Sequence, residues 1–204
     1  FGSGIAGLLT AHKLSALGTV NVITKKQAAE SNTNYAQGGI AAVMDRLDSF
    51  AAHVEDTKKA GAGLCHDDVV KLTVEDAPVR IRELQELGVR FAQTEQKPDL
   101  GLEGGHSRRR VLHSGDTTGA EIERALLAAC RSDPRIRFFE NHVAVNLILR
   151  EPAGSIPTAQ NRVVGAYALS APGSVDTFLA RATVLATGGA GKVYLYTSNP
   201  DIAT

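Results

Sequence analysis

Side chains suited to binding a polar ligand are concentrated in residues 31–39, which have the sequence SNTNYAQGG. This segment contains three side-chain amides, three hydroxyls and two adjacent glycines. A tight turn uses only about one or two residues of these types, with glycine providing a positive φ angle and Asn or Ser closing a local hydrogen bond. The surplus predicts a loop that wraps around a polar ligand, although these residues alone do not identify it.

A second candidate binding element is the pattern G-x-G-x-x-G formed by Gly2, Gly4 and Gly7. In dinucleotide-binding proteins the first glycine makes a tight turn, the second lets the backbone approach a pyrophosphate, and the third lets a helix pack on a strand. The helix N-terminus then faces the phosphates. Glycines at these spacings also occur in ordinary turns, but an amphipathic helix and a strand follow here, which favours a dinucleotide site.

The end of the next strand bears on which dinucleotide is bound. An NAD site has an acidic residue about 20 residues after the glycines, where it holds a ribose hydroxyl. This chain has Thr24 and Lys25 at that place. We therefore expect NADP or FAD rather than NAD, and the alternative for Lys25 is a solvated lysine at a strand end.

The elements that would position these residues form an α/β pattern. Apolar residues at helical spacing predict a helix over residues 5–17 that ends at Gly18, and helices over residues 49–60, 67–87 and 116–132. Pro78 is expected to kink or divide the third of these helices. Alternating and β-branched residues predict strands at 19–24, 136–140, 143–151, 162–171 and 177–187, with a hairpin-like loop at 152–161. The prediction is a Rossmann-like parallel sheet, its first strand mostly missing, beside a small antiparallel meander.

Composition excludes several functional classes. The 22 basic residues balance 22 acidic ones, so no net field attracts nucleic acid or an anionic membrane. The local cluster Arg108 to Arg110 has no flanking aromatic platform. Cys65 and Cys130 lack CxxC spacing, which indicates a reducing compartment and no disulfide framework or metal site. No apolar run of about 18 residues or signal peptide is present, so a soluble chain is expected.

Four motifs carry a resemblance to a known family. They are GSGIAGL at residues 2–8, TNYAQGGIAAV at 33–43, LEGGHSRRRVLHSGDTTG at 102–119 and VLATGGAGKVYLYTSNPD at 184–201. Together they resemble the succinate dehydrogenase and fumarate reductase flavoprotein family over essentially the whole chain. The resemblance implies a glutathione-reductase-like FAD-binding domain that is truncated at both ends. Its capping and C-terminal helical domains are expected to be absent, so the chain alone should not turn over substrate.

The resemblance also implies which residues contact FAD. Residues of the glycine turn are expected at the phosphates, Lys25 near the adenosine end, and Ala144 on the adenine side. The phosphate residues are Ser3, Gly4, Ile5 and Ala6. The residues expected to line the flavin are Asn32, Thr33, Asn34, Tyr35, Ala36, Gln37, Gly38 and Gly39. Thr187, Gly188 and Asp201 match family positions that return to the cofactor.

One departure from the family concerns how FAD is attached. The membrane-linked succinate dehydrogenases carry a His five residues before the Gln of AQGG, and that His bonds covalently to the flavin. This chain has Asn32 at that position. An amide cannot form the bond, so FAD should be held non-covalently.

A second departure is Glu103 in LEGGHS, where succinate dehydrogenases typically have Phe. A carboxylate suits a dicarboxylate substrate only if that substrate also carries a positive charge, as the ammonium of aspartate does. The resemblance therefore implies a member that oxidises L-aspartate to iminoaspartate, the first step of NAD biosynthesis, with flavin reoxidised by oxygen or fumarate. A solvated loop Glu is the alternative for Glu103.

Other roles stay open on the sequence alone. His106 and His113 fit an active site or a structural role equally well, and Arg108 to Arg110 could bind substrate carboxylates or local groups. A soluble fumarate reductase or succinate dehydrogenase flavoprotein is the close alternative, and a non-catalytic FAD-binding module is an alternative of another class. The resemblance implies a cytoplasmic location and quinolinate synthase as a partner, with no nucleic acid or membrane.

Overall fold

The computed structural model describes residues 1–150, 162–171 and 173–203. These residues form two compact units, one made of Phe1–Thr33 with Leu126–Thr204 and the other of Asn34–Ala125. The predicted loop at 152–161 lies outside the described residues. Helix α4 (Thr118–Ser132) contributes its first part to the second unit and its last part to the first.

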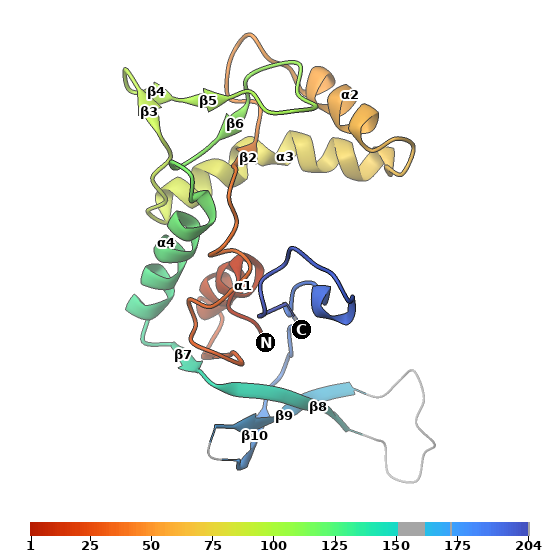
Figure 1. Ribbon diagram of the computed structural model, residues 1–204. Coiled ribbons are helices and arrows are strands. Elements are labelled where there is room, and N and C mark those ends of the chain that lie inside the picture. Colours follow the sequence, from red (N-terminus) through yellow and green to blue (C-terminus); the bar gives the residue numbers. More distant parts are fainter. Residues whose placement is uncertain (151–161, 172, 204) are drawn as a thin grey trace. The chain divides into compact units, whose positions relative to one another are not determined.

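The first unit is a small α/β structure (Figure 1). Helix α1 (Ile5–Ser15) follows the glycine turn, and β1 (Val20–Ile23) pairs in parallel with β7 (Ile136–Phe139). Strands β8 (His142–Arg150), β9 (Arg162–Ser170) and β10 (Val175–Leu179) form an antiparallel sheet in the order β10-β9-β8. A short 3-10 helix, η1, covers Gly191–Val193. The predicted parallel sheet and antiparallel meander are both confirmed.

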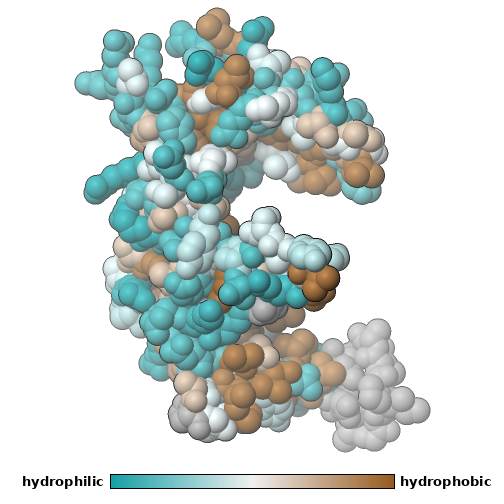
Figure 2. All heavy atoms as spheres, viewed as in Figure 1, coloured by the Kyte–Doolittle hydropathy of each residue, from teal (hydrophilic) through white to brown (hydrophobic). Residues whose placement is uncertain are grey.

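The core of the first unit explains why these segments fold together. Leu8 and Ala11 of α1 are buried against the apolar residues of the parallel pair, and Cys130 donates its thiol hydrogen to the carbonyl oxygen of Leu8 at 3.3 Å. One face of the antiparallel sheet remains apolar and exposed, and Figure 2 shows hydrophobic side chains over it. The exposed apolar residues of that sheet include Val143, Val145, Tyr167, Leu169, Val175 and Leu179.

The second unit combines two long helices with very short strands. Helix α2 (Phe50–Ala60) begins after Ser49, whose hydroxyl accepts the N–H of Ala52 at 3.1 Å, and α3 covers Asp67–Glu86. Strands β2 (Ile40–Ala41), β6 (Val111–Leu112) and β5 (Leu100–Gly101) pair antiparallel in that order. Strands β3 (Gln93–Thr94) and β4 (Lys97–Pro98) form a separate hairpin.

Two predicted element boundaries are wrong, and one expected break does not occur. Of the two outcomes expected at Pro78, division is contradicted, because α3 is one helix whose buried residues Val74, Pro78, Ile81 and Leu84 continue across that position. Helix α1 ends at Ser15 with Ala16 as C-cap, short of Gly18. The strand predicted over residues 177–187 ends at Leu179; beyond it the N–H of Ala180 still donates to the carbonyl oxygen of Val164, and Val184 and Ala186 bond to Phe1.

Candidate dinucleotide site

The first unit contains a cavity of about 630 Å³, a size typical of small-molecule sites. It lies where the glycine turn, the end of β1, the start of β8 and the segment at 185–188 come together. Residues 30–33 and 202–203 complete its wall. Segments from both ends of the sequence therefore build one pocket around the start of α1.

The glycine turn of this cavity has no room for a side chain at Gly2 or Gly7. Gly2 has φ +108°, and a Cβ atom added there would overlap the carbonyl oxygen of Ala186. A Cβ on Gly7 would overlap the carbonyl oxygen of Gly2. Helix α1 begins directly after this turn, and Gly4 provides no side-chain cap. Because the first N–H groups of a helix have no intrahelical acceptor, this arrangement suits an anionic group.

Hydroxyl groups fix the shape of the turn. The Ser3 hydroxyl donates to the Thr24 hydroxyl at the end of β1 over 3.1 Å. The Thr33 hydroxyl accepts the N–H of Ile5 at 3.1 Å, so this amide of the helix start already has a partner. Thr33 therefore links the polar segment at 31–39 to the glycine turn.

Two charged residues line the cavity. Burial, and then the neighbouring Lys26, lower the pKa of the Lys25 ammonium. Glu30 lies on the same wall. His142 also lines the cavity, and its ring nitrogens lie 2.6 Å from the carbonyl oxygen of Glu140 and 3.2 Å from the Asp176 carboxylate.

Asn32 supplies a buried acceptor. Within the described part of the chain, its side-chain oxygen is buried and no hydrogen-bond partner reaches it. A buried polar atom without a partner costs free energy, on the order of 1–3 kcal/mol. A ligand donor in the cavity would remove that cost, so the glycine cradle and Asn32 together fit a dinucleotide such as FAD.

The structure brings ten of the predicted cofactor residues to this cavity. They are Ser3, Gly4, Ile5, Ala6, Lys25, Asn32, Thr33, Ala144, Thr187 and Gly188. Asp201 is not in the lining: it forms an ion pair with Lys192, while its neighbours Ile202 and Ala203 line the cavity.

Sequence reasoning missed Glu30 and His142 as lining residues. The acidic residue of an NAD site was expected at the end of the strand, at Thr24 and Lys25, and Glu30 lies a few residues further along. Its separation in sequence from the glycines could have suggested that it lines the cavity. His142 reaches the cavity from β8, which only the tertiary fold brings beside the glycine turn.

The predicted flavin residues from Asn34 to Gly39 belong to the second unit. The start of α4 holds them: Gly119 donates its N–H to the carbonyl oxygen of Ala36 at 3.0 Å, and the Thr118 hydroxyl donates to that of Gly38. A Cβ on Gly39 would overlap the carbonyl oxygen of Leu112, so close packing on β6 requires this glycine.

Glu103 lies beside this glycine pair. It is exposed, and its carboxylate oxygen Oε1 is 3.8 Å from the position that a Cβ on Gly38 would occupy. The two motifs AQGG and LEGGHS, which are far apart in the sequence, therefore meet within the second unit.

The arginine cluster separates into three environments. Arg108 is exposed, Arg109 donates to the carbonyl oxygen of Leu100 at 3.2 Å, and Arg110 is fully buried between Asp48 and Asp56. Of the alternatives left open above, local carboxylates therefore engage Arg110. His106 lies 3.3 Å from Arg110, and His113 lies 3.8 Å from the Asp99 carboxylate.

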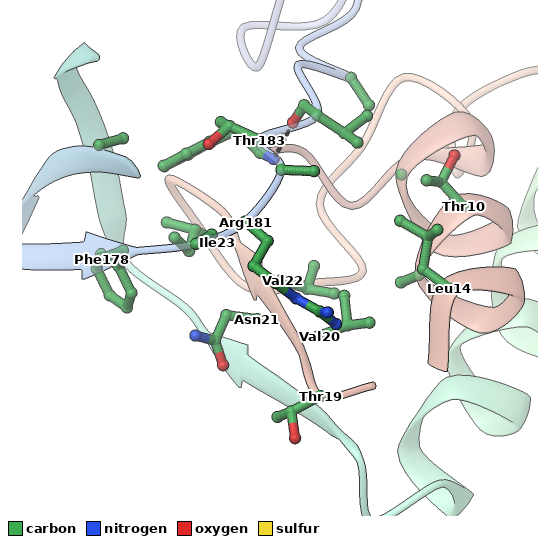
Figure 3. Close-up of a pocket in the computed structure, with 18 of the residues that line it drawn as sticks. Thr10, Leu14, Thr19, Val20, Asn21, Val22, Ile23, Phe178, Arg181 and Thr183 are labelled. Atoms are coloured by element: carbon green, nitrogen blue, oxygen red, sulfur yellow. Dashed lines mark hydrogen bonds between the residues drawn. The ribbon is translucent and has the colours of Figure 1, made fainter. Parts of the chain in front are cut away.

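The first unit has a second hollow, a groove of about 830 Å³ (Figure 3). Side chains from α1, β1 and residues 178–186 line it, among them Leu14, Val20, Val22 and Thr183. Arg181 brings its guanidinium into the same groove. In the described part of the chain, no helix has the length and apolar character needed to cross a membrane.

Comparisons with known proteins agree with this geometry. The family model described as "FAD binding domain" matches residues 1–204. The chain is 47% identical to L-aspartate oxidase of Pseudomonas aeruginosa, with 98% of this chain and 38% of that protein aligned. It is 45% identical to the chloroplastic L-aspartate oxidase of Arabidopsis thaliana, covering 100% of this chain and 31% of that protein.

A solved structure shares the fold. The FrdA chain of E. coli quinol fumarate reductase superposes with a TM-score of 0.87 at 29% identity, over 99% of this chain and 34% of that one. The chain thus spans roughly a third of the length of these relatives. From the glycine cradle, the cavity and the match over residues 1–204, we conclude that the chain belongs to the FAD-binding domain family of succinate dehydrogenase and fumarate reductase flavoproteins, with FAD as its cofactor.

Proposed function

We propose that this chain is the FAD-binding part of an enzyme that oxidises L-aspartate to iminoaspartate. The observation that carries the proposal is the position of Glu103 beside Gly38 of AQGG, the segment expected to line the flavin. The identity of 47% with a protein named L-aspartate oxidase supports the same substrate. Succinate and fumarate carry no ammonium group that a carboxylate would recognise.

The proposed reaction removes two electrons and two protons from aspartate. The Cα–H bond breaks with its electron pair, the nitrogen loses one proton to water, and a C=N bond forms. Bound FAD supplies the two-electron acceptor for the hydride. The chain's own contribution would be binding and orientation: the glycine turn and Lys25 would hold the cofactor, and Asn32 would contact it without a covalent bond.

Glu103 would accept a hydrogen bond from the substrate ammonium. Such charge-assisted bonds are shorter and stronger than neutral ones, and they strengthen when substrate excludes water. The contact would also orient the Cα–H bond, because the ammonium and that hydrogen share one carbon atom. Glu103 thus provides selectivity for an amino acid over succinate.

The test is a pair of steady-state assays on full-length protein with matched FAD occupancy. Glu103→Gln should lower kcat/KM for aspartate by roughly 30-fold, equivalent to about 2 kcal/mol of lost charge pairing. Fumarate reduction should change by less than about 5-fold, because fumarate makes no such contact. Glu86→Gln, an exposed residue at the end of α3, is the matched control. Equal losses in both activities would assign Glu103 to the flavin or the fold instead.

A fumarate reductase or succinate dehydrogenase flavoprotein is the second candidate. The TM-score of 0.87 with E. coli quinol fumarate reductase FrdA favours it as a fold. Glu103 and Asn32 disfavour it, because those residue types replace the Phe and the flavin-linking His. A non-catalytic FAD-binding module, the candidate of another class, would bind FAD but show neither activity.

The proposed product suggests its metabolic setting. An imine is readily hydrolysed in water, so an enzyme that consumes it should act close by. On the family resemblance we propose quinolinate synthase, which places the reaction first in NAD biosynthesis. Cys65 and Cys130 are not joined in a disulfide, as is common in reducing compartments, which supports a cytoplasmic location.

A further inference from the structure

Arg110 is completely buried, although it follows two exposed arginines. Its Nε and Nη2 atoms each donate to one carboxylate oxygen of Asp48 at 2.8 Å, and Nη1 donates to Asp56 at 2.6 Å. Asp48 lies just before α2 and Asp56 lies within it. These forked ion pairs therefore fix Arg110, the residue just before β6, to the N-terminal part of α2.

Asp56 also holds the segment that carries Glu103, residues 102–109, which we call the Glu103 loop. One oxygen of Asp56 accepts the Ser107 N–H at 2.8 Å and the Ser107 hydroxyl at 2.7 Å. The Ser107 N–H, followed by its hydroxyl and by Arg110, holds the pKa of the Asp56 carboxyl well below its usual range. Asp56 is therefore an ionised acceptor at neutral pH, on which the loop and Arg110 converge.

His106 of the same loop is oriented by Arg110. Its Nδ1 atom lies 3.3 Å from Nη1 of Arg110. A guanidinium group only donates, so Nδ1 accepts and the neutral ring carries its hydrogen on Nε2. His53 packs edge-on at 5.8 Å between ring centres, and burial, followed by Arg110 and His106, lowers its pKa. Both imidazoles therefore pack against the Arg110 ion-pair cluster.

We infer that Arg110 is a positioning residue that fixes the Glu103 loop on α2 and so keeps Glu103 beside Gly38. This rests on the proposed role of Glu103 in aspartate recognition. A buried ion pair adds little net stability compared with apolar side chains of similar size, but its directional bonds define where the partners lie. Lysine would keep the charge and lose the fork to Asp48 and the contact with His106.

The test is a double-mutant cycle on full-length protein. Arg110→Lys should lower kcat/KM for aspartate about 10-fold, mainly through KM, with FAD affinity changed by less than about 2-fold. In the Glu103→Gln background the same substitution should change kcat/KM by less than about 2-fold, because its effect passes through Glu103. The inference would be overturned if Arg110→Lys lowered kcat/KM by the same factor in both backgrounds. It would also be overturned if FAD affinity fell as much as kcat/KM did.

Hydrogen exchange of the Glu103 loop provides a readout that does not depend on aspartate turnover. Amides 102–109 should exchange faster in Arg110→Lys. The matched control is Arg80→Lys, since Arg80 also pairs with two carboxylates, Asp76 and Glu83, but on the exposed face of α3. Unchanged exchange in Arg110→Lys would also overturn the inference.

A milder variant covers the case in which Arg110→Lys does not fold. Ser107→Ala removes one of the two loop bonds to Asp56 and leaves the ion pairs intact. It should also speed exchange of the loop and raise KM for aspartate, and unchanged values would overturn the inference. If Glu103→Gln shows no selective loss, the proposed function fails, while the exchange data still decide whether Arg110 holds the loop.

Discussion

Gly2 combines a positive φ angle with a close backbone neighbour. Its φ of +108° is unfavourable for any side chain, and an added Cβ would overlap the carbonyl oxygen of Ala186. Gly2→Ala should therefore destabilise the protein by about 2–5 kcal/mol, from backbone strain together with overpacking. Thermal unfolding of full-length protein, with and without FAD, measures the loss.

Gly63→Ala is the matched control for this substitution. Gly63 has φ +89°, and nothing lies within 4 Å of an added Cβ. It should therefore show only the cost of backbone strain, about 1–3 kcal/mol. Equal losses for Gly2→Ala and Gly63→Ala would contradict the close approach of Ala186 to the turn.

The residue type at position 32 leads us to expect a non-covalently held cofactor. The Asn32 amide lies in the cavity wall and cannot form the covalent link that a histidine makes in the membrane-linked relatives. Denaturing full-length protein with acid or heat should therefore release free FAD into the supernatant. The check is flavin fluorescence after precipitation, and fluorescence that stays with the polypeptide would show that the prediction is wrong.

At the scale of elements, the groove beside β1 is shaped for one more strand. Phe1 donates its amino group to the carbonyl oxygen of Val184 at 2.7 Å and accepts the N–H of Ala186 at 2.8 Å, a parallel ladder pattern. The next residue, Gly2, bonds to β1: its N–H donates to the carbonyl oxygen of Ile23 at 2.9 Å. The groove continues from Phe1 between Val20 and Thr183 (Figure 3).

Filling this groove should stabilise the first unit. A five-residue Val/Ile-rich extension before Phe1 should raise Tm by at least about 5 °C relative to a Gly/Ser extension of equal length, since each buried side chain contributes about 2 kcal/mol. The extension also replaces the Phe1 ammonium, whose pKa burial lowers, with a neutral amide. Calorimetry of the two forms provides the comparison. Equal Tm values would mean that no strand enters the groove.

The long helices were predictable because their apolar residues repeat over many turns. Ser49 and the apolar stripe of α3 are local signals, and both helices were placed within about one residue. Strands such as β2 and β6 contain two residues each, too few to show a period, so only tertiary pairing defines them. The segment at 181–187 has strand-like residues, but the backbone bonds of Val184 and Ala186 are made to Phe1, a contact that its own pattern could not indicate.

The candidate site was predictable to the extent that motifs are local. The glycine turn and Asn32 were found from spacing and residue type, and they line one cavity. The burial of Arg110 could not be predicted, because Asp48, just before α2, and Asp56, within α2, lie more than 50 residues earlier in the sequence. The same applies to His142, which reaches the cavity from another element of the fold.

At the scale of the whole molecule, substrate choice is the central claim. The chain spans 38% of its Pseudomonas relative, so the claim must be tested on full-length protein. The most direct measurement is the visible flavin absorbance after anaerobic addition of aspartate or succinate to the FAD-loaded protein. We predict that aspartate bleaches the flavin and succinate does not, because the proposed role of Glu103 is to recognise an ammonium group. Bleaching by succinate with no response to aspartate would contradict this account.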